Sequence, residues 1–167
     1  IIAYLLEKPH ITIFKDLSTV ASSYDFSSSY EITDLKNKKI LHVADLLNQA
    51  SSYIRAWIPA IESLGGKICW SMVAVDRMQG GKQKLEDLDV HSFAMFEIKP
   101  YLFSQIHDMG LINDLQLKML NDFYNNPDDT MREFLISHPE FIKDALNSDE
   151  KSAKRAKLCI DNNLYNL

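Results

Sequence analysis

Two polar segments of this chain carry residue types that could bind a charged ligand. The segment Asp45 to Ser52 begins with a carboxylate and continues with amide and hydroxyl side chains, which could cap a helix and bind an anion there. The segment Asp76 to Gly81 contains Arg77, whose planar guanidinium can form paired hydrogen bonds with a carboxylate. These residue types could bind an anion beside a helix N-terminus, and Arg77 is the best single candidate for contact with a ligand.

A strand–helix–strand pattern positions both segments. Ile40 to Val43 and Ile68 to Val75 are apolar runs typical of buried strands, and Gly65-Gly66 ends the helix expected between them. Two such strands joined by a helix form a parallel unit that is covered on both faces, and ligands bind at the carboxyl ends of its strands. Both polar segments lie at those ends. The helix is expected over Ala50 to Leu64, with one apolar face made of Ile54, Trp57, Ile58, Ile61 and Leu64.

These residues resemble a known enzyme family. The run VDRMQGGKQKLEDLDVHSF, Val75 to Phe93, resembles the end of an orotate phosphoribosyltransferase, where a strand ending in Asp-Arg is followed by a Gln-Gly-Gly turn. The run ILHVADLLNQASS is similar to the family's phosphoribosyl pyrophosphate loop, four apolar residues and then Asp-Asp-x-x-Thr-x-Gly. The resemblance implies an α/β fold with a mostly parallel central sheet of the type I phosphoribosyltransferase kind. It covers residues 1–103, and an all-helical C-terminal extension follows over 104–167.

The resemblance also implies roles for individual residues. Asp45 would hold the ribose of the donor and Lys15 its pyrophosphate, so these two are the candidate catalytic residues. Arg77 would contact the base, and Mg²⁺ would accompany the donor, with no metal site made by protein groups alone. The candidate substrate-binding residues are Arg77, Asn48, Gln49, Ala50, Ser51 and Ser52. Without the resemblance, Asp45 to Ser52 is a polar turn with a helix cap, and Arg77 is a structural arginine paired with Asp76 or another carboxylate.

The sequence departs from the family pattern where the chemistry is demanding. Ala44 replaces the first acid of the loop, Asn48 replaces its threonine and Ala50 its glycine, and a β-carbon disfavours the positive φ that glycine allows. A further departure is Phe14, which stands where the family has an arginine. The segment Asp16 to Ser29, which matches the family's catalytic loop, has six serines and one threonine, and no Lys or Arg lies between residues 15 and 36.

A loop that neutralises a pyrophosphate leaving group needs fixed cations, so we expect impaired or lost catalysis. Two other interpretations remain open. One is an active transferase that joins phosphoribosyl pyrophosphate to orotate or another base. The other is a non-catalytic module that senses a nucleotide or mainly dimerises. The resemblance implies a homodimer and a small-molecule nucleotide or phosphoribosyl donor as partners.

Composition and the remaining segments add weaker expectations. The net charge of −5 disfavours a nucleic-acid surface, and the two cysteines form no metal or disulfide pattern, as expected for a cytoplasmic protein. No apolar run has the length of a membrane span. The first core strand and the N-terminal hood of the family are expected to lie before Ile1. From Glu97 the pattern is helical, with a final helix capped by Ser148 whose lysines form a solvated face.

Overall fold

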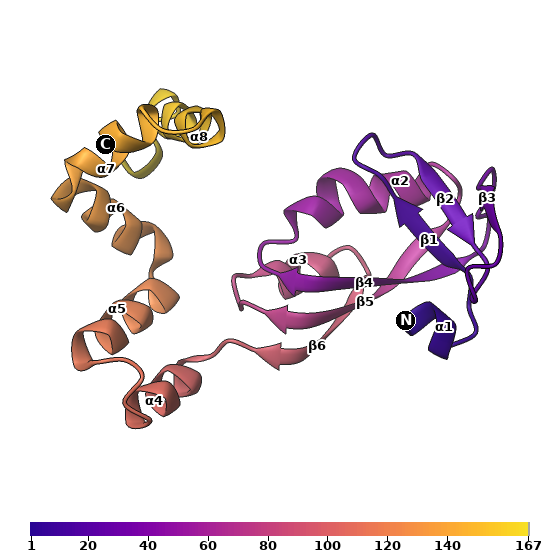
Figure 1. The fold of residues 1–167 in the computed structure, drawn as a ribbon, viewed down its shortest axis with the longest axis horizontal. Coiled ribbons are helices and arrows are strands. Elements are labelled where there is room, and N and C mark those ends of the chain that lie inside the picture. The colour runs from indigo at the N-terminus through magenta and orange to yellow at the C-terminus, as the bar shows by residue number, and fades with distance from the viewer. Residues whose placement is uncertain (167) are drawn as a thin grey trace. The chain divides into compact units, whose positions relative to one another are not determined.

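The chain forms two compact units in the computed structural model, which describes residues 1–166 (Figure 1). The first unit is Ile1–Ile98 and the second is Lys99–Leu167. The sequence places the end of the core at residue 103, inside helix α4 (Pro100–Asp108). The structural division comes earlier because α4 packs on the helices that follow it: the rings of Phe103 and Tyr124 meet edge to face with centroids 6.1 Å apart.

A parallel three-stranded sheet forms the centre of the first unit (Figure 1). Its strands are β4 (Lys39–Leu47), β5 (Lys67–Asp76) and β6 (His91–Glu97), in that spatial order. With helices between its strands and a helical second unit, the chain has an α/β fold with a parallel central sheet, as the sequence predicts.

Both crossover connections put their helices on the same face of this sheet. Right-handed crossovers that advance in one direction across a sheet stack their helices on one side. The first crossover contains the π-helix η1 (Tyr53–Trp57) and α2 (Ile58–Glu62), and the second contains α3 (Gly81–Glu86). Side chains from both crossovers join one buried cluster with the strands: Leu47, Ala50, Tyr53, Ile61, Ile68, Val73, Leu85 and Val90.

The first crossover helix is shorter than predicted and begins with a widened turn. The N–H of Ile58 donates to the carbonyl of Tyr53, five residues back. Pro59 explains the widening, because its ring lacks an N–H and crowds the carbonyl four residues before it. The widened turn changes which residue faces the core. Tyr53 is 2% exposed, whereas Ile54, which simple helical spacing places on the apolar face, is 43% exposed.

A hydrogen-bonded network crosses the covered face of the sheet. The Tyr53 hydroxyl lies 3.0 Å from Nδ1 of His42 on β4 and 2.5 Å from Oγ of Ser71 on β5. The imidazole of His42 also stacks on Trp57, with ring centroids 4.3 Å apart. The network therefore joins two strands and the crossover helix through polar groups that the sequence does not single out.

A second, antiparallel sheet precedes the parallel one. It contains β1 (His10–Ile13), β2 (Thr19–Ser22) and β3 (Ser29–Glu31), and follows the short helix α1 (Ile2–Leu5). The serine-rich segment contains β2, which pairs with β1 and with β3, so this part of the chain folds as two successive hairpins.

The second unit is a succession of short helices. After α4 come α5 (Asp114–Asn125), α6 (Pro127–Ser137), α7 (Pro139–Leu146), α8 (Glu150–Asp161) and the 3-10 turn η2 (Leu164–Asn166). The N-cap of α8 is Asp149, which accepts hydrogen bonds from the N–H groups of residues 151 and 152, so the prediction that Ser148 caps it is wrong. None of the helices within residues 1–166 has the length and apolar character to span a membrane.

His42 gives the network a measurable pH dependence. Burial lowers the pKa of His42 from 6.5 to about 4, so the unfolded chain binds the proton more readily than the folded chain between these pH values. The contribution of His42 to the free energy of unfolding is fully present above pH 6.5. It decreases by about 3 kcal/mol as the pH falls toward 4. In His42→Phe, which keeps a ring against Trp57 and cannot titrate, the free energy of unfolding should fall less over this range. Urea unfolding at several pH values measures it, and equal acid sensitivity in both proteins would contradict the assignment.

Candidate functional site

The carboxyl ends of β4 and β5 meet, as the strand–helix–strand pattern predicts. Leu47 and Asp76 are register partners in the parallel ladder, and the N–H of Arg77 donates to the carbonyl of Leu47 at 2.9 Å. This hydrogen bond continues the pairing beyond the last residue of β5. The segments Asp45 to Ser52 and Asp76 to Gly81 therefore lie side by side.

Asp76 holds the turn after β5 rather than pairing with Arg77. It is 1% exposed, and its Oδ1 accepts a hydrogen bond of 2.7 Å from the N–H of Met78. Met78 has φ of +58°, which the short-range carboxylate bond helps to hold. Arg77 is exposed and forms no ion pair within residues 1–166. Within residues 1–166, Arg77 therefore does not form the structural ion pair with Asp76 that the sequence allowed.

Gly80 and Gly81, which follow, are required for different structural reasons. Gly80 has φ of +82° and open space around it, so it supplies the left-handed turn. Gly81 begins α3 against the backbone of the other segment. A β-carbon on Gly81 would collide with the carbonyl oxygen of Asn48 and lie 2.9 Å from Cδ1 of Leu47. The run of two glycines is thus required by a turn and by a close approach between the two candidate segments.

An open hollow of about 490 Å³ lies beside this turn. Lys82 and Gln83 from the first turn of α3 bring hydrogen-bond donors to it, and Asp76 and Glu86 bring carboxylates. Lys82 and Gln83 are not among the site residues predicted from the sequence, although their position directly after the two glycines is a signal that identifies them. The hollow has the volume of a small-ligand site.

Asp45 lies within β4, not in the loop after it. The predicted strand stops before Asp45, whereas β4 continues through Leu47. Asp45 is exposed, and the alternation of side chains along a strand places it on the face opposite Ala44. Ala44 packs against the buried cluster, so the position of the family's first acid is a core position here. One exposed carboxylate therefore stands where the family pattern has two.

The loop residues do not cap the helix with their side chains. The side-chain oxygen of Asn48 accepts the N–H of Gln49 at 2.8 Å, which closes a local turn, and Ser52 makes no capping hydrogen bond. The first helical bond runs from the N–H of Ile54 to the carbonyl of Ala50 at 3.1 Å. The amides of Ser51 and Ser52 precede it and have no acceptor within the helix. An anion bound at the start of this helix would therefore accept hydrogen bonds from the backbone amides of Ser51 and Ser52.

Ala50 adopts the conformation that its β-carbon was expected to resist. Its φ is +55°, and the residue is 2% exposed, with its methyl group in the buried cluster. Left-handed backbone costs a residue other than glycine about 1 kcal/mol, and burial of the methyl group offsets part of this cost. Ala50 therefore keeps the loop backbone in a glycine-like conformation.

Lys15 lies in a different sheet from the other candidates. It is exposed in the turn between β1 and β2, and no hydrogen bond or ion pair within residues 1–166 connects it with the ends of β4 and β5. The next residue, Asp16, accepts hydrogen bonds from the N–H and the hydroxyl of Ser18 at 3.1 and 2.6 Å. The structure thus brings together Asp45, the loop and Arg77, but not Lys15.

The second hairpin turn is closed in the same way. The carboxylate of Asp25 accepts the hydroxyl of Ser23 at 2.6 Å and both the hydroxyl and the N–H of Ser27, at 2.8 and 3.1 Å. These hydrogen bonds, the serine hydroxyls first, lower the pKa of Asp25 to about 2. Of the seven serine and threonine hydroxyl groups in the serine-rich segment, those of Ser18, Ser23 and Ser27 therefore donate to its own carboxylates.

The residues present suit a magnesium ion only if the ligand brings it. No group of three or more His, Cys, Asp or Glu side chains within residues 1–166 could hold a metal. Mg²⁺ is commonly held by one or two carboxylates together with substrate phosphates and water. Asp45, as an exposed carboxylate two residues before the end of β4, fits that minimal role.

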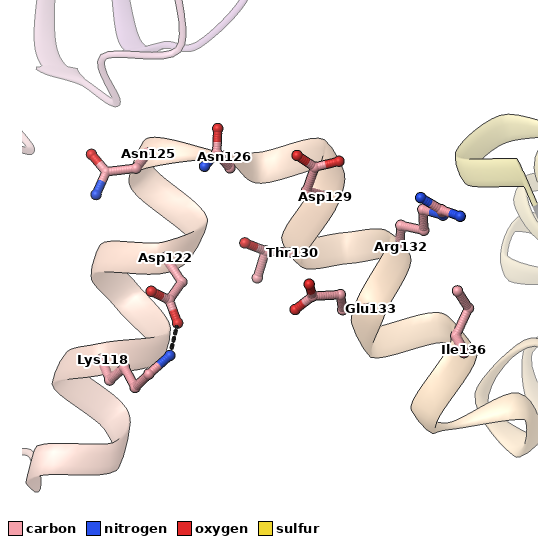
Figure 2. A pocket seen from close by; sticks show the side chains of 9 residues that line it. All are labelled: Lys118, Asp122, Asn125, Asn126, Asp129, Thr130, Arg132, Glu133 and Ile136. Atoms are coloured by element: carbon pink, nitrogen blue, oxygen red, sulfur yellow. Dashed lines mark hydrogen bonds and ion pairs between the residues drawn. The ribbon is translucent and has the colours of Figure 1, made fainter.

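A second hollow, of about 480 Å³, lies between α5 and α6 of the helical unit (Figure 2). Lys118 and Asp122 on α5 pair with each other at 2.6 Å, and α6 contributes Asp129, Arg132 and Glu133. None of the side chains that line it is buried. Exposed, mixed charges of this kind do not build a binding site.

Sequence comparison identifies orotate phosphoribosyltransferases as relatives of this chain. The chain is 27% identical over 90 residues to the orotate phosphoribosyltransferase of Sulfolobus acidocaldarius, an alignment that covers 54% of this chain and 45% of the relative. It is 28% identical over 107 residues to that of Sulfurisphaera tokodaii, which covers 64% and 48%. The chain resembles the orotate phosphoribosyltransferases. It spans slightly less than half the length of these relatives. No protein-family model matches the sequence.

The fold supports the resemblance independently. The structure of Leishmania donovani UMP synthase aligns with a TM-score of 0.55 and 18% identity, over 74% of this chain and 25% of that chain. At this identity the likeness concerns the fold alone. Together with the sequence matches, it supports an orotate phosphoribosyltransferase-like scaffold of the type I kind.

The contact between Gly81 and Asn48 can be tested by adding one methyl group. Gly81→Ala should reduce the free energy of unfolding by about 2 kcal/mol, because overpacking against fixed backbone typically costs 1–3 kcal/mol. Gly80→Ala is the matched control, since its β-carbon meets nothing within 4 Å and the cost is that of positive φ alone, about 1 kcal/mol. Chemical denaturation of both variants measures the difference. A smaller loss in Gly81→Ala than in Gly80→Ala would show that the two segments do not touch.

Proposed function

We propose that this chain is an orotate phosphoribosyltransferase-like protein of pyrimidine nucleotide metabolism that binds phosphoribosyl ligands but has impaired or lost catalysis. The curated relatives are orotate phosphoribosyltransferases, which supports the metabolic assignment. The chemistry of the serine-rich hairpins supports the loss of activity. By resemblance we also propose a cytoplasmic homodimer, with no nucleic-acid partner.

The observation that carries the proposal is the use of the hairpin hydroxyls. Departure of pyrophosphate requires fixed positive charge near its oxygens. The hairpins have no Lys or Arg between residues 15 and 36, and Asp16 and Asp25 add negative charge there. These carboxylates also accept the hydroxyl hydrogen bonds of Ser18, Ser23 and Ser27, which leaves fewer neutral donors for a leaving group. Lys15 is the one lysine or arginine that the hairpin residues 10–31 offer to a pyrophosphate.

The parts that bind a ligand are better preserved. Asp45 would hold the ribose hydroxyls and the donor's Mg²⁺, which would neutralise phosphate charge when bound. The amides of Ser51 and Ser52, together with the left-handed Ala50, would receive the 5′-phosphate, beside Asn48 and Gln49. Arg77, exposed and without an ion pair within residues 1–166, would bind the carboxylate edge of orotate. We therefore expect the chain to bind phosphoribosyl ligands without efficient turnover.

The principal alternative is an active transferase. The names of the curated relatives favour it, and so do the exposed Asp45 and Arg77. A non-catalytic module that senses nucleotides or mainly dimerises would share the binding properties but show no turnover at all.

Calorimetric titration of the full chain can separate donor binding from base binding. Phosphoribosyl pyrophosphate with Mg²⁺ should bind, and Asp45→Asn should weaken that binding at least tenfold because the variant loses the carboxylate charge. Arg77→Ala should weaken orotate binding at least tenfold while donor binding changes less than threefold. Arg55→Ala removes an exposed arginine of the crossover helix and is the matched control, with both affinities unchanged. Equal affinities in wild type and both site variants would place the site elsewhere.

A further inference from the structure

A row of polar side chains crosses the helix-covered face of the parallel sheet. His42 on β4 and Ser71 on β5 are register partners, and Ser71 is aligned in turn with Ser92 on β6. Ser71 is fully buried and Ser92 is 6% exposed. A buried hydroxyl group is costly unless it forms a hydrogen bond. The row therefore requires a polar group from the element that packs over it, and Tyr53 supplies one through its bonds to His42 and Ser71.

Tyr53 fixes how the first turn of the crossover helix faces the sheet. It directly follows the loop residues Ser51 and Ser52, so its ring leaves the helix within one turn of their amides. Its hydroxyl bonds to two strands at once, and its ring meets the indole of Trp57 edge to face, with centroids 4.7 Å apart. Contacts at both ends of the side chain leave it one orientation, which sets the rotation of the first helical turn about its axis.

The backbone before this turn is strained and lacks a side-chain cap. Ala50 has φ of +55°, a conformation that persists in such a residue only where the surrounding structure imposes it. Ser52, at the helix N-cap, makes no side-chain capping hydrogen bond within residues 1–166. The first helical bond joins the N–H of Ile54 to the carbonyl of Ala50. Tyr53, which precedes the donor of that bond, is the adjacent buried side chain that can hold the loop backbone in this conformation.

We propose that the Tyr53 hydroxyl positions the phosphate-binding backbone, by directing the amides of Ser51 and Ser52 toward the ligand. This role depends on the proposed function, because it takes those amides as the site of the 5′-phosphate. Tyr53 is 2% exposed, so it acts through the backbone that it orients and not by contact with the phosphate. Loss of its hydroxyl therefore weakens phosphate binding while every group that contacts the phosphate is still present.

Hydrogen exchange of the full chain without ligand tests whether Tyr53 holds the loop. Tyr53→Phe keeps the ring and loses the hydroxyl, so the Ile54 amide, the donor of the first helical bond, should exchange at least tenfold faster. Ile61→Val is the control for a general loss of stability, because it removes one methyl group from a residue of the same helix that is 1% exposed. The Ile54 amide should exchange within threefold of wild type in this control. Equal exchange in wild type and Tyr53→Phe, or equal acceleration in both variants, would overturn the proposal.

Calorimetry with ribose 5-phosphate tests the consequence for binding. Tyr53→Phe should raise the dissociation constant of ribose 5-phosphate at least fivefold. The dissociation constant of orotate, which the proposed function assigns to Arg77, should change less than twofold in the same variant. A general loss of stability would move both constants alike. In the control Ile61→Val, both constants should stay within twofold of wild type.

Ser71→Ala gives a second test, because it removes the anchor of the Tyr53 hydroxyl on β5. It should raise the dissociation constant of ribose 5-phosphate at least twofold. Tyr53→Phe/Ser71→Ala should bind no more weakly than Tyr53→Phe, since both changes act on one hydrogen bond. An unchanged affinity in Tyr53→Phe, or additive losses in the double variant, would contradict the positioning role. A wild type that does not bind ribose 5-phosphate would instead contradict the proposed function, and the exchange of the Ile54 amide would still decide whether Tyr53 holds the loop.

Discussion

The close approach of two strand ends is the constraint on which the rest of this structure depends. The N–H of Arg77 bonds to the carbonyl of Leu47, and Gly81 packs against the carbonyl of Asn48 where no side chain fits. These contacts fix the loop after β4 beside the turn after β5. They therefore set where an anion and a flat base would be bound, and they explain why the glycine pair follows Asp76-Arg77 so closely. The hydrogen bonds of the Tyr53 hydroxyl support these contacts, because they connect the crossover helix with both β4 and β5.

The proposed function assigns recognition and catalysis to different parts of the chain. The recognition elements belong to the parallel sheet, where backbone hydrogen bonds and buried apolar side chains hold them. The elements that would move charge during a reaction belong to the antiparallel hairpins, where Asp16 and Asp25 occupy the nearby hydroxyls. A protein that lost its cations in such hairpins would keep its sheet and its ligand-binding loop. That separation explains how a phosphoribosyltransferase scaffold could persist with weak chemistry.

Much of the parallel unit could be predicted from the sequence, because buried strands, a glycine helix stop and the Asp-Arg-x-Gln-Gly-Gly run are local signals. The extension of β4 through Asp45 could not, since a charged residue at a sheet edge breaks an apolar run without ending the strand. The selection of Tyr53 over Ile54 for the core could not either, because it depends on a widened turn before Pro59. Ala50 shows the converse: its intrinsic preference against positive φ is outweighed by tertiary packing.

The most direct measurement is pyrophosphate release by the full chain at saturating phosphoribosyl pyrophosphate, Mg²⁺ and orotate, once calorimetry has shown that both ligands are bound. Typical enzymes turn over at about 1–10³ s⁻¹. The account predicts release at least a hundredfold below the lower end of this range with both ligands bound, because the hairpins offer the leaving group little positive charge. Release at an ordinary enzymatic rate, matched by the loss of orotate, would contradict it and show that the cations missing from the hairpins are not needed.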